Sequence, residues 1–247
     1  MNVFPASEDS GGNRAILGLR LRRFRRLPIL NIQPAEGAYR ERLVIRAERR
    51  GKEWSHDGIK FGRVEAAAAA FLEADGYRVD HCENSAVTCI MKAASLATVV
   101  PSNRIFEDFS RVASFFYESF VKWEPTLLDA ARQEMSSIAP ELVEANIRRI
   151  VNDPGFTNMQ GRHDAEVFCQ FYRKLGNENV VKIFDVFRLD PYRYRKGWPD
   201  LLAVKDGEVI VGEVKSPKDR ISQFQRDIET DILQSIPVRS ILIEVVS

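Results

Sequence analysis

The sequence is poor in cysteine and has no long apolar run, and both absences narrow the class of protein. Its three cysteines, Cys82, Cys89 and Cys169, show neither CxxC spacing nor the even count of a disulfide framework. We therefore expect free, mostly buried thiols and a reducing compartment. The apolar residues between positions 16 and 30 are interrupted by five arginines, which excludes a membrane span in that stretch.

The N-terminal segment has no feature of a secretory signal. Residues 1–13 are polar, contain Glu8 and Asp9, and are typical of disordered chain. Together with the free thiols, this segment predicts a soluble intracellular protein. The sequence does not distinguish a location in the cytoplasm or nucleoid of a prokaryote from one in the nucleus of a eukaryote.

Neither sign of charge dominates, but the charges are unevenly placed. Residues 1–60 contain 13 Lys+Arg and 7 Asp+Glu (net +6), and the remainder contains 23 and 28 (net −5). A basic section beside an acidic remainder fits a phosphate-chain substrate, and it fits a solvated arm as well. The basic run at 20–26 is either a phosphate-contacting segment or a solvated turn of helix. The 247 residues suit one large domain with or without an extension.

The most informative stretch, residues 197–220, has the pattern of a β-hairpin. Residues 201–204 and 209–214 are rich in strand formers, and Asp206-Gly207 between them is a favoured pair for a two-residue type I′ turn. Counting outward from that turn predicts the register. The opposed pairs are Lys205 and Glu208, Val204 and Val209, Ala203 and Ile210, Leu202 and Val211, Leu201 and Gly212, and Asp200 and Glu213.

This register brings two carboxylates and a lysine together. Asp200 faces Glu213, and Lys215, two residues further on, points to the same face. Opposed like charges destabilise a sheet, and a hard divalent cation bound by the carboxylates would compensate for them. Such a metal activates water for attack on a phosphodiester, and Lys215 would orient that water or stabilise the phosphate. The alternative is a surface hairpin in which Lys215 merely screens Glu213.

Upstream of the hairpin, residues 63–75 predict a helix, because a run of alanines ends at Gly76. Before this helix, the stretch from 41 to 62 predicts a strand and then an irregular link around positions 56–58. Glu65 lies seven residues before Leu72, on the apolar side, so it could face inward. A glutamate in the first turn is also favoured by the helix dipole alone, and the residues by themselves favour that interpretation.

Residues 86–175 predict a helical section without an internal repeat. Helical patterns cover about 86–99, 104–120, 126–136, 140–151 and 164–175, and prolines lie at or between helix starts. The aromatic residues of this section favour a core over a base-stacking surface, with one or two exposed rings left open. They are Phe106, Phe109, Phe115, Phe116, Tyr117, Phe120 and Trp123.

The apolar run at 180–189 predicts a strand. In residues 190–196, Arg193, Arg195 and Lys196 alternate with two tyrosines, which favours contact with a DNA backbone over a plain exposed loop. After the hairpin, residues 220–233 predict an amphipathic helix with Asp219 as its N-cap and Gln225 outside the apolar stripe. Residues 240–245 predict a buried strand that closes the sheet. This order of elements predicts an α/β domain with a mixed sheet.

Two blocks of the sequence resemble VRR-NUC domains of the PD-(D/E)xK nuclease superfamily, most closely the Fanconi-associated nuclease type. One block is formed by Gly197, Pro199-Asp200-Leu201, Glu213-Val214-Lys215, Pro217 and Asp219-Arg220. The other is formed by Val64-Glu65, Gly76-Tyr77 and His81-Cys82-Glu83. The chain departs from the pattern at Ser216 and at Asn84-Ser85, where glycines are usual.

The resemblance implies a restriction-endonuclease-like core over residues 45–247, with a large helical insertion at about 86–175 and a basic, partly disordered extension at 1–44. It implies a DNA phosphodiesterase that depends on Mg²⁺ or Mn²⁺. It also implies roles for residues. Asp200, Glu213 and the Val214 carbonyl would bind metal, Lys215 would act on the water, Glu65 would complete the acidic site, and Glu83 is a further candidate ligand. Arg193, Arg195, Lys196, Asp219 and Arg220 are candidate DNA contacts, while His81 and Cys82 are expected to be structural.

These features predict a structure-selective deoxyribonuclease that acts as a monomer on flaps or branched DNA in repair. The resemblance suggests that the helical insertion occupies the surface that compact members use for dimerisation. One alternative is a dimeric Holliday-junction resolvase. Another is a DNA-binding protein without hydrolytic activity, against which the intact Asp200, Glu213 and Lys215 argue.

Overall fold

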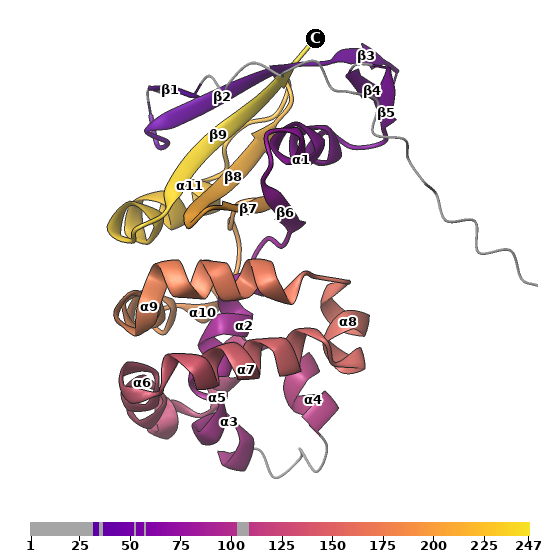
Figure 1. The fold of residues 1–247 in the computed structure, drawn as a ribbon. Helices are drawn as coiled ribbons and strands as arrows, with labels where there is room; N and C mark the ends of the chain where they lie inside the picture. The colour runs from indigo at the N-terminus through magenta and orange to yellow at the C-terminus, as the bar shows by residue number, and fades with distance from the viewer. Residues whose placement is uncertain (1–31, 35–36, 52, 57, 103–108) are drawn as a thin grey trace, which may run out of the picture.

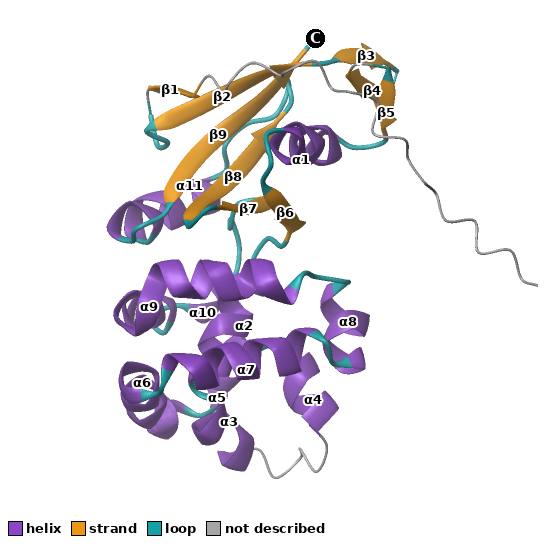
Figure 2. Cartoon of the chain, viewed as in Figure 1, coloured by secondary structure: helices purple, strands orange, loops and turns teal. Residues whose placement is uncertain are grey.

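The computed structural model describes residues 32–34, 37–51, 53–56, 58–102 and 109–247 (Figure 1). The segment 1–13, the basic run at 20–26 and Phe106 lie outside these ranges. Within them, the strands gather at one end of the molecule and most helices at the other (Figure 2). The chain passes from the strands to this helical lobe (residues 85–194) and back once, through short segments that contain Glu83 and Asp200.

The described residues contain a six-stranded mixed sheet in the order β1-β2-β9-β8-β7-β6. Strands β2, β9 and β8 are parallel, and the other neighbours are antiparallel. Because β9 lies between β2 and β8, the last strand is an inner strand of the sheet and does not close an edge. Strands β1 and β2 place residues 32–34 and 41–46 in the sheet, although residues 1–44 are expected from the sequence to form an extension. The bounds are Ile32–Pro34 (β1), Glu41–Arg46 (β2), Arg78–His81 (β6), Leu201–Lys205 (β7), Glu208–Lys215 (β8) and Arg239–Val246 (β9).

The hairpin of β7 and β8 has the predicted register, from the Lys205–Glu208 pair to the Leu201–Gly212 pair. Asp206 (φ 48°) and Gly207 (φ 81°) both adopt positive φ, as a type I′ turn requires. The turn chemistry therefore sets which face of the hairpin each side chain occupies.

Each face of the sheet is covered by apolar residues. Helix α1 (Val64–Ala74), in the predicted position, packs Ala68 and Leu72 against one face. The other face joins a second core that includes α11 (Gln223–Asp231) and the helical lobe. A small sheet of β3 (Glu48–Arg50), β4 (Glu53–His56) and β5 (Ile59–Phe61) precedes α1, where the sequence predicts an irregular link.

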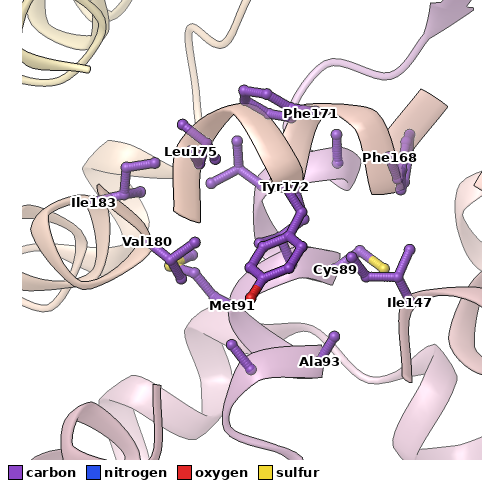
Figure 3. Close-up of a cluster of buried hydrophobic side chains, with 14 of the residues drawn as sticks. Cys89, Met91, Ala93, Ile147, Phe168, Phe171, Tyr172, Leu175, Val180 and Ile183 are labelled. Atoms are coloured by element: carbon purple, nitrogen blue, oxygen red, sulfur yellow. The ribbon is translucent and has the colours of Figure 1, made fainter. Parts of the chain in front are cut away.

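The helical lobe has its own aromatic and aliphatic core, part of which is drawn in Figure 3. Tyr117 and Phe120 are buried in it, as predicted, whereas Phe116 and Trp123 are exposed (44% and 71%). No helix in the described ranges is long and apolar enough to cross a membrane. The bounds are Ser85–Ala94 (α2), Leu96–Ser102 (α3), Phe109–Ser114 (α4), Tyr117–Trp123 (α5), Leu128–Ser137 (α6), Pro140–Val151 (α7), Pro154–Gln160 (α8), Ala165–Phe187 (α9) and Pro191–Tyr194 (α10), with short 3-10 turns at Pro125–Leu127 and Leu233–Ser235.

The strand predicted at 180–189 is wrong. Residues up to Phe187 belong to α9, which is kinked at Gly176 (φ 64°). Val180, Phe184 and Phe187 are all buried, and their spacing of four and then three residues is that of one helix face. The high content of β-branched and aromatic residues favours a strand locally, but packing in the helical lobe overrides that preference. The helices of the lobe therefore continue through α10.

The predicted N-cap of the last helix is also wrong. Helix α11 begins at Gln223, and Ser222 caps it through a capping box with Gln225. The carboxylate of Asp219 instead accepts hydrogen bonds from the N–H and hydroxyl of Ser216, at 2.8 and 2.7 Å. Asp219 thus closes the turn that follows β8.

Candidate active site

Asp200 and Glu213 come together at the end of the β7–β8 hairpin, as the register predicts. Asp200 Oδ2 accepts a hydrogen bond of 2.9 Å from the Val214 N–H, which ties the residue before β7 to β8. Glu213 is almost completely buried, with 1% of its surface exposed. Burial, and after it the charge of Asp200, raises the pKa of Glu213 to about 8. Two carboxylates at this position therefore resist being ionised together.

The two oxygens of Glu213 differ in their surroundings. Oε1 lies 2.6 Å from Lys215 Nζ and accepts a hydrogen bond of 2.5 Å from the Gln225 amide. Oε2 is buried and has no hydrogen-bond partner. Buried carboxylate oxygens are normally satisfied, so Oε2 is the one atom of this group that needs a further partner.

Gln225 also belongs to the site, although in the sequence it only falls outside the apolar stripe of its helix and has no feature that indicates a role there. Its Oε1 accepts a hydrogen bond from the Ser222 N–H at 2.8 Å, and its Nε2 donates to Glu213. The capping box thus fixes the orientation of the amide that holds the carboxylate. The Ser-x-x-Gln spacing is a recognisable signal for the helix start, but it does not by itself indicate the contact with Glu213.

Glu65 and Glu83 lie beside Asp200 in a cleft of about 450 Å³. Burial raises the pKa of Asp200, the hydrogen bond from Val214 opposes that rise, and the charges of Glu65 and Glu83 add to it. Glu65 comes from the first turn of α1, so the helix side predicted by the resemblance faces the site. Glu83 has a left-handed backbone (φ 39°) directly after β6, in the tight turn that leads into α2.

Among the described residues, no group of three or more His, Cys, Asp or Glu side chains lies close enough together to hold a metal ion. Glu65 and Glu83 therefore line the cleft without closing on Asp200 and Glu213. Cys82 is buried and His81 is exposed, and His81 also lines the cleft.

The wall of the cleft contributed by the helical lobe is held by a buried histidine that the sequence does not single out. His163 Nδ1 lies 2.7 Å from Asp80, and Nε2 lies 2.9 Å from the Gln160 carbonyl. Both nitrogens must carry protons to donate in this arrangement. Burial alone would lower the pKa of His163, but the hydrogen bond and charge of Asp80 raise it above its ordinary value. Asp80 also accepts from the Asp164 N–H at 2.6 Å, so it joins β6 to the start of α9.

The structure places the three cations predicted before β7 in different surroundings. Arg193 pairs with Asp227 at 2.9 Å, and Arg195 pairs with Glu118 at 2.8 Å. Lys196 forms no ion pair with a described carboxylate, and its ammonium group lies 5.0 Å from the centre of the Phe224 ring.

Arg220 follows β8, in the segment that leads to α11. It is exposed and lines a second groove of about 630 Å³, which Lys215 and Asp219 also line.

The described residues form a mixed α/β fold in which two carboxylates meet at the end of one hairpin of the sheet, and solved structures share this fold. Two solved structures similar to this chain are of paFAN1, one bound to a 2-nt 5′ flap DNA with a gap and one to a 1-nt 5′ flap DNA with a gap. The first has a TM-score of 0.53 and 19% identity, with 74% of this chain and 35% of that chain covered. The second has a TM-score of 0.54 and 18% identity, with 83% and 37% covered. This chain thus matches about a third of paFAN1. No family model and no curated protein matches the sequence.

Proposed function

We propose that this protein is a divalent-metal-dependent DNA nuclease that hydrolyses phosphodiester bonds at flap or branched DNA, in DNA repair. The observation that carries the proposal is the meeting of Asp200, Glu213 and Lys215 at the end of one hairpin. The pairing of a buried carboxylate with a second carboxylate and a lysine has little value for stability, because burial and repulsion oppose it. Such an arrangement is expected where the groups act together on a ligand.

The donor set fits a hard cation such as Mg²⁺ or Mn²⁺. Oε2 of Glu213 is buried without a partner, and carboxylate oxygens are the preferred ligands of these ions. Asp200 and Glu213 would hold the metal with the Val214 carbonyl, and Glu65 and Glu83 would contribute by moving inward from the walls of the cleft. When bound, the metal would supply an activated water and charge stabilisation at the phosphate.

The chain's own residues would prepare this site for hydrolysis. Lys215, whose side chain is only 15% exposed, stays beside Glu213 and would orient the attacking water or stabilise the developing negative charge. Gln225 holds Oε1 of Glu213 from α11, so Oε2 keeps a fixed direction. Both residues would act by positioning charge before substrate arrives, which reduces the reorganisation needed during the reaction.

Substrate binding would use cations around the site. Lys196, Arg220, Arg193 and Arg195 are the candidates for phosphate contacts, and Asp219 holds the turn that carries Arg220. Arg193 and Arg195 would have to share their charge with Asp227 and Glu118, so Lys196 and Arg220 are the stronger candidates. The paFAN1 structures are of complexes with flap DNA, which supports flaps as the substrate. A monomer with the helical lobe as an asymmetric wall would suit such DNA better than a symmetric dimer.

A substrate panel tests the proposal. Purified protein is incubated with labelled flap, four-way junction, duplex and single-stranded DNA, with Mg²⁺ or Mn²⁺ and with chelator, while its mass in solution is measured. We expect a monomer that cleaves flaps only when metal is present. A stable dimer that makes paired symmetric cuts in junctions would favour a resolvase instead. Cleavage that does not require metal, or a failure to cleave any of the substrates, would contradict the proposal.

A further inference from the structure

Lys196 and Phe224 form an exposed pair between the segment before β7 and the first turn of α11. Phe224 is 40% exposed, and the Lys196 ammonium lies 5.0 Å from its ring centre. Single exposed apolar residues are common and need no explanation. Here, however, a cation that has no carboxylate partner among the described residues lies over the ring, and such a contact is attractive.

The local backbone holds this pair in place. Gly197 has a positive φ of 81°, and a Cβ atom at that position would lie 2.4 Å from the Phe224 carbonyl carbon. The chain before β7 therefore rests directly on the first turn of α11, and only glycine permits that approach. Lys196 and Phe224 meet across this contact, so their relative position is set by packed backbone and not by flexible side chains alone.

Both chain segments also continue to the candidate catalytic groups. Phe224 immediately precedes Gln225, whose amide contacts Glu213. Lys196 lies four residues before Asp200. An exposed aromatic ring and an ammonium group are thus carried by the two short segments that also hold Gln225 and Asp200.

An exposed aromatic ring beside a cation has the chemistry of a single-stranded nucleic-acid subsite. Every base has a π-face, so stacking on an aromatic ring selects unpaired bases without selecting their sequence. A base inside a duplex is already stacked on both sides, so it gains nothing from the ring. The cation beside the ring is placed to contact the phosphate of the same nucleotide.

We infer that Phe224 and Lys196 form a stacking subsite for an unpaired nucleotide next to the cleavage position. Phe224 would receive the base, and Lys196 would contact its phosphate. The subsite would let the enzyme distinguish a flap from a nicked, fully paired duplex. This inference rests on the proposed function, because it assumes that DNA binds at Asp200 and Glu213.

The test measures binding without cleavage, in Ca²⁺. Fluorescence anisotropy compares a nicked duplex that carries a few unpaired nucleotides with the same nicked duplex without them. The variants are Phe224→Ala, Phe224→Trp and, as a matched control, Trp123→Ala, which removes an exposed aromatic ring of the helical lobe. A 2-aminopurine in the unpaired segment reports stacking by quenching, and thermal melting confirms that each variant is folded.

We expect Phe224→Ala to weaken binding of the flap substrate by about 5- to 100-fold and to leave the nicked duplex within about twofold of wild type. Quenching should be lost in Phe224→Ala and kept in Phe224→Trp and Trp123→Ala. Equal losses for both substrates, or a Phe224→Ala variant that matches Trp123→Ala, would overturn the subsite while leaving the proposed function intact. If the wild-type protein binds neither DNA, both the subsite and the proposed function fail.

Discussion

Lys215 Nζ lies 2.6 Å from Oε1 of Glu213, two residues away on the same face of strand β8. The contact engages one oxygen of the carboxylate and leaves Oε2 buried without a partner. Metal binding requires both carboxylates to be ionised, and with Asp200 at the same end of the hairpin the lysine then neutralises only part of the local negative charge. The remaining imbalance is what a bound cation would remove, and it leads to the first prediction.

Replacing either carboxylate by its amide, Asp200→Asn or Glu213→Gln, is expected to lower the cleavage rate by more than about a hundredfold. Removing a residue that only supports a metal ligand already lowers metal affinity or activity by about 10- to 100-fold. Removing a ligand itself should lower activity further. Without metal, each variant should melt at or above the wild-type temperature, since it removes one member of a buried, mutually repelling pair.

Gel assays of labelled flap DNA and thermal melting in chelator check these two outcomes. Glu53→Gln, an exposed carboxylate on β4 that pairs with Lys60, is the matched control and should cleave as wild type does. Near wild-type cleavage by both amide variants would exclude the metal assignment, and so would wild-type activity that is unaffected by chelator.

Lys215→Met is expected to retain DNA binding and to lose the chemical step. Its charge acts where negative charge develops on the phosphate, and loss of one such donor costs about 10²–10³-fold in rate. Single-turnover cleavage at saturating protein measures the step directly. The control is Lys182→Met, an exposed lysine on α9 whose pairing with Glu178 should contribute little. Comparable rates for the two methionine variants would reject a catalytic role for Lys215.

The His163–Asp80 contact predicts a pH-dependent contribution to stability. The pKa of His163 in the folded state is raised above its ordinary value. Protonation of His163 therefore stabilises the folded state. That contribution is fully present below the unfolded pKa of about 6.5 and is lost as the pH rises through the higher folded-state value. His163→Asn should therefore destabilise the protein more at acidic than at alkaline pH.

Thermal melting over this pH range, taken as the difference between wild type and variant, isolates the histidine from other titrating groups. His81→Asn provides the control, because His81 is exposed at the end of the same strand that carries Asp80. A difference for His163→Asn that does not vary with pH would show that the ring stabilises the junction by packing alone.

Local chemistry alone is enough to predict several parts of the site from the sequence. Asp206-Gly207 specifies a type I′ turn, and a two-residue turn leaves only one register for the strands that it joins. The opposition of Asp200 and Glu213 follows from counting alone. The helix of α1 is likewise local, because an alanine run ended by a glycine needs no distant partner to be recognised.

Tertiary structure decided what depends on residues far away in the chain. The run at 180–189 has the composition of a strand, and it becomes helical because one face of it packs into the helical lobe. Gln225 reaches Glu213 only because α11 begins at Gln223, capped by Ser222, and the tertiary fold brings the first turn of this helix to β8. Arg193 and Arg195 look alike in sequence to Lys196, yet carboxylates from α11 and α5 pair with the first two and leave the third on Phe224. Periodicity and turn chemistry act over a few residues, whereas these pairings require that segments tens of residues apart be packed together.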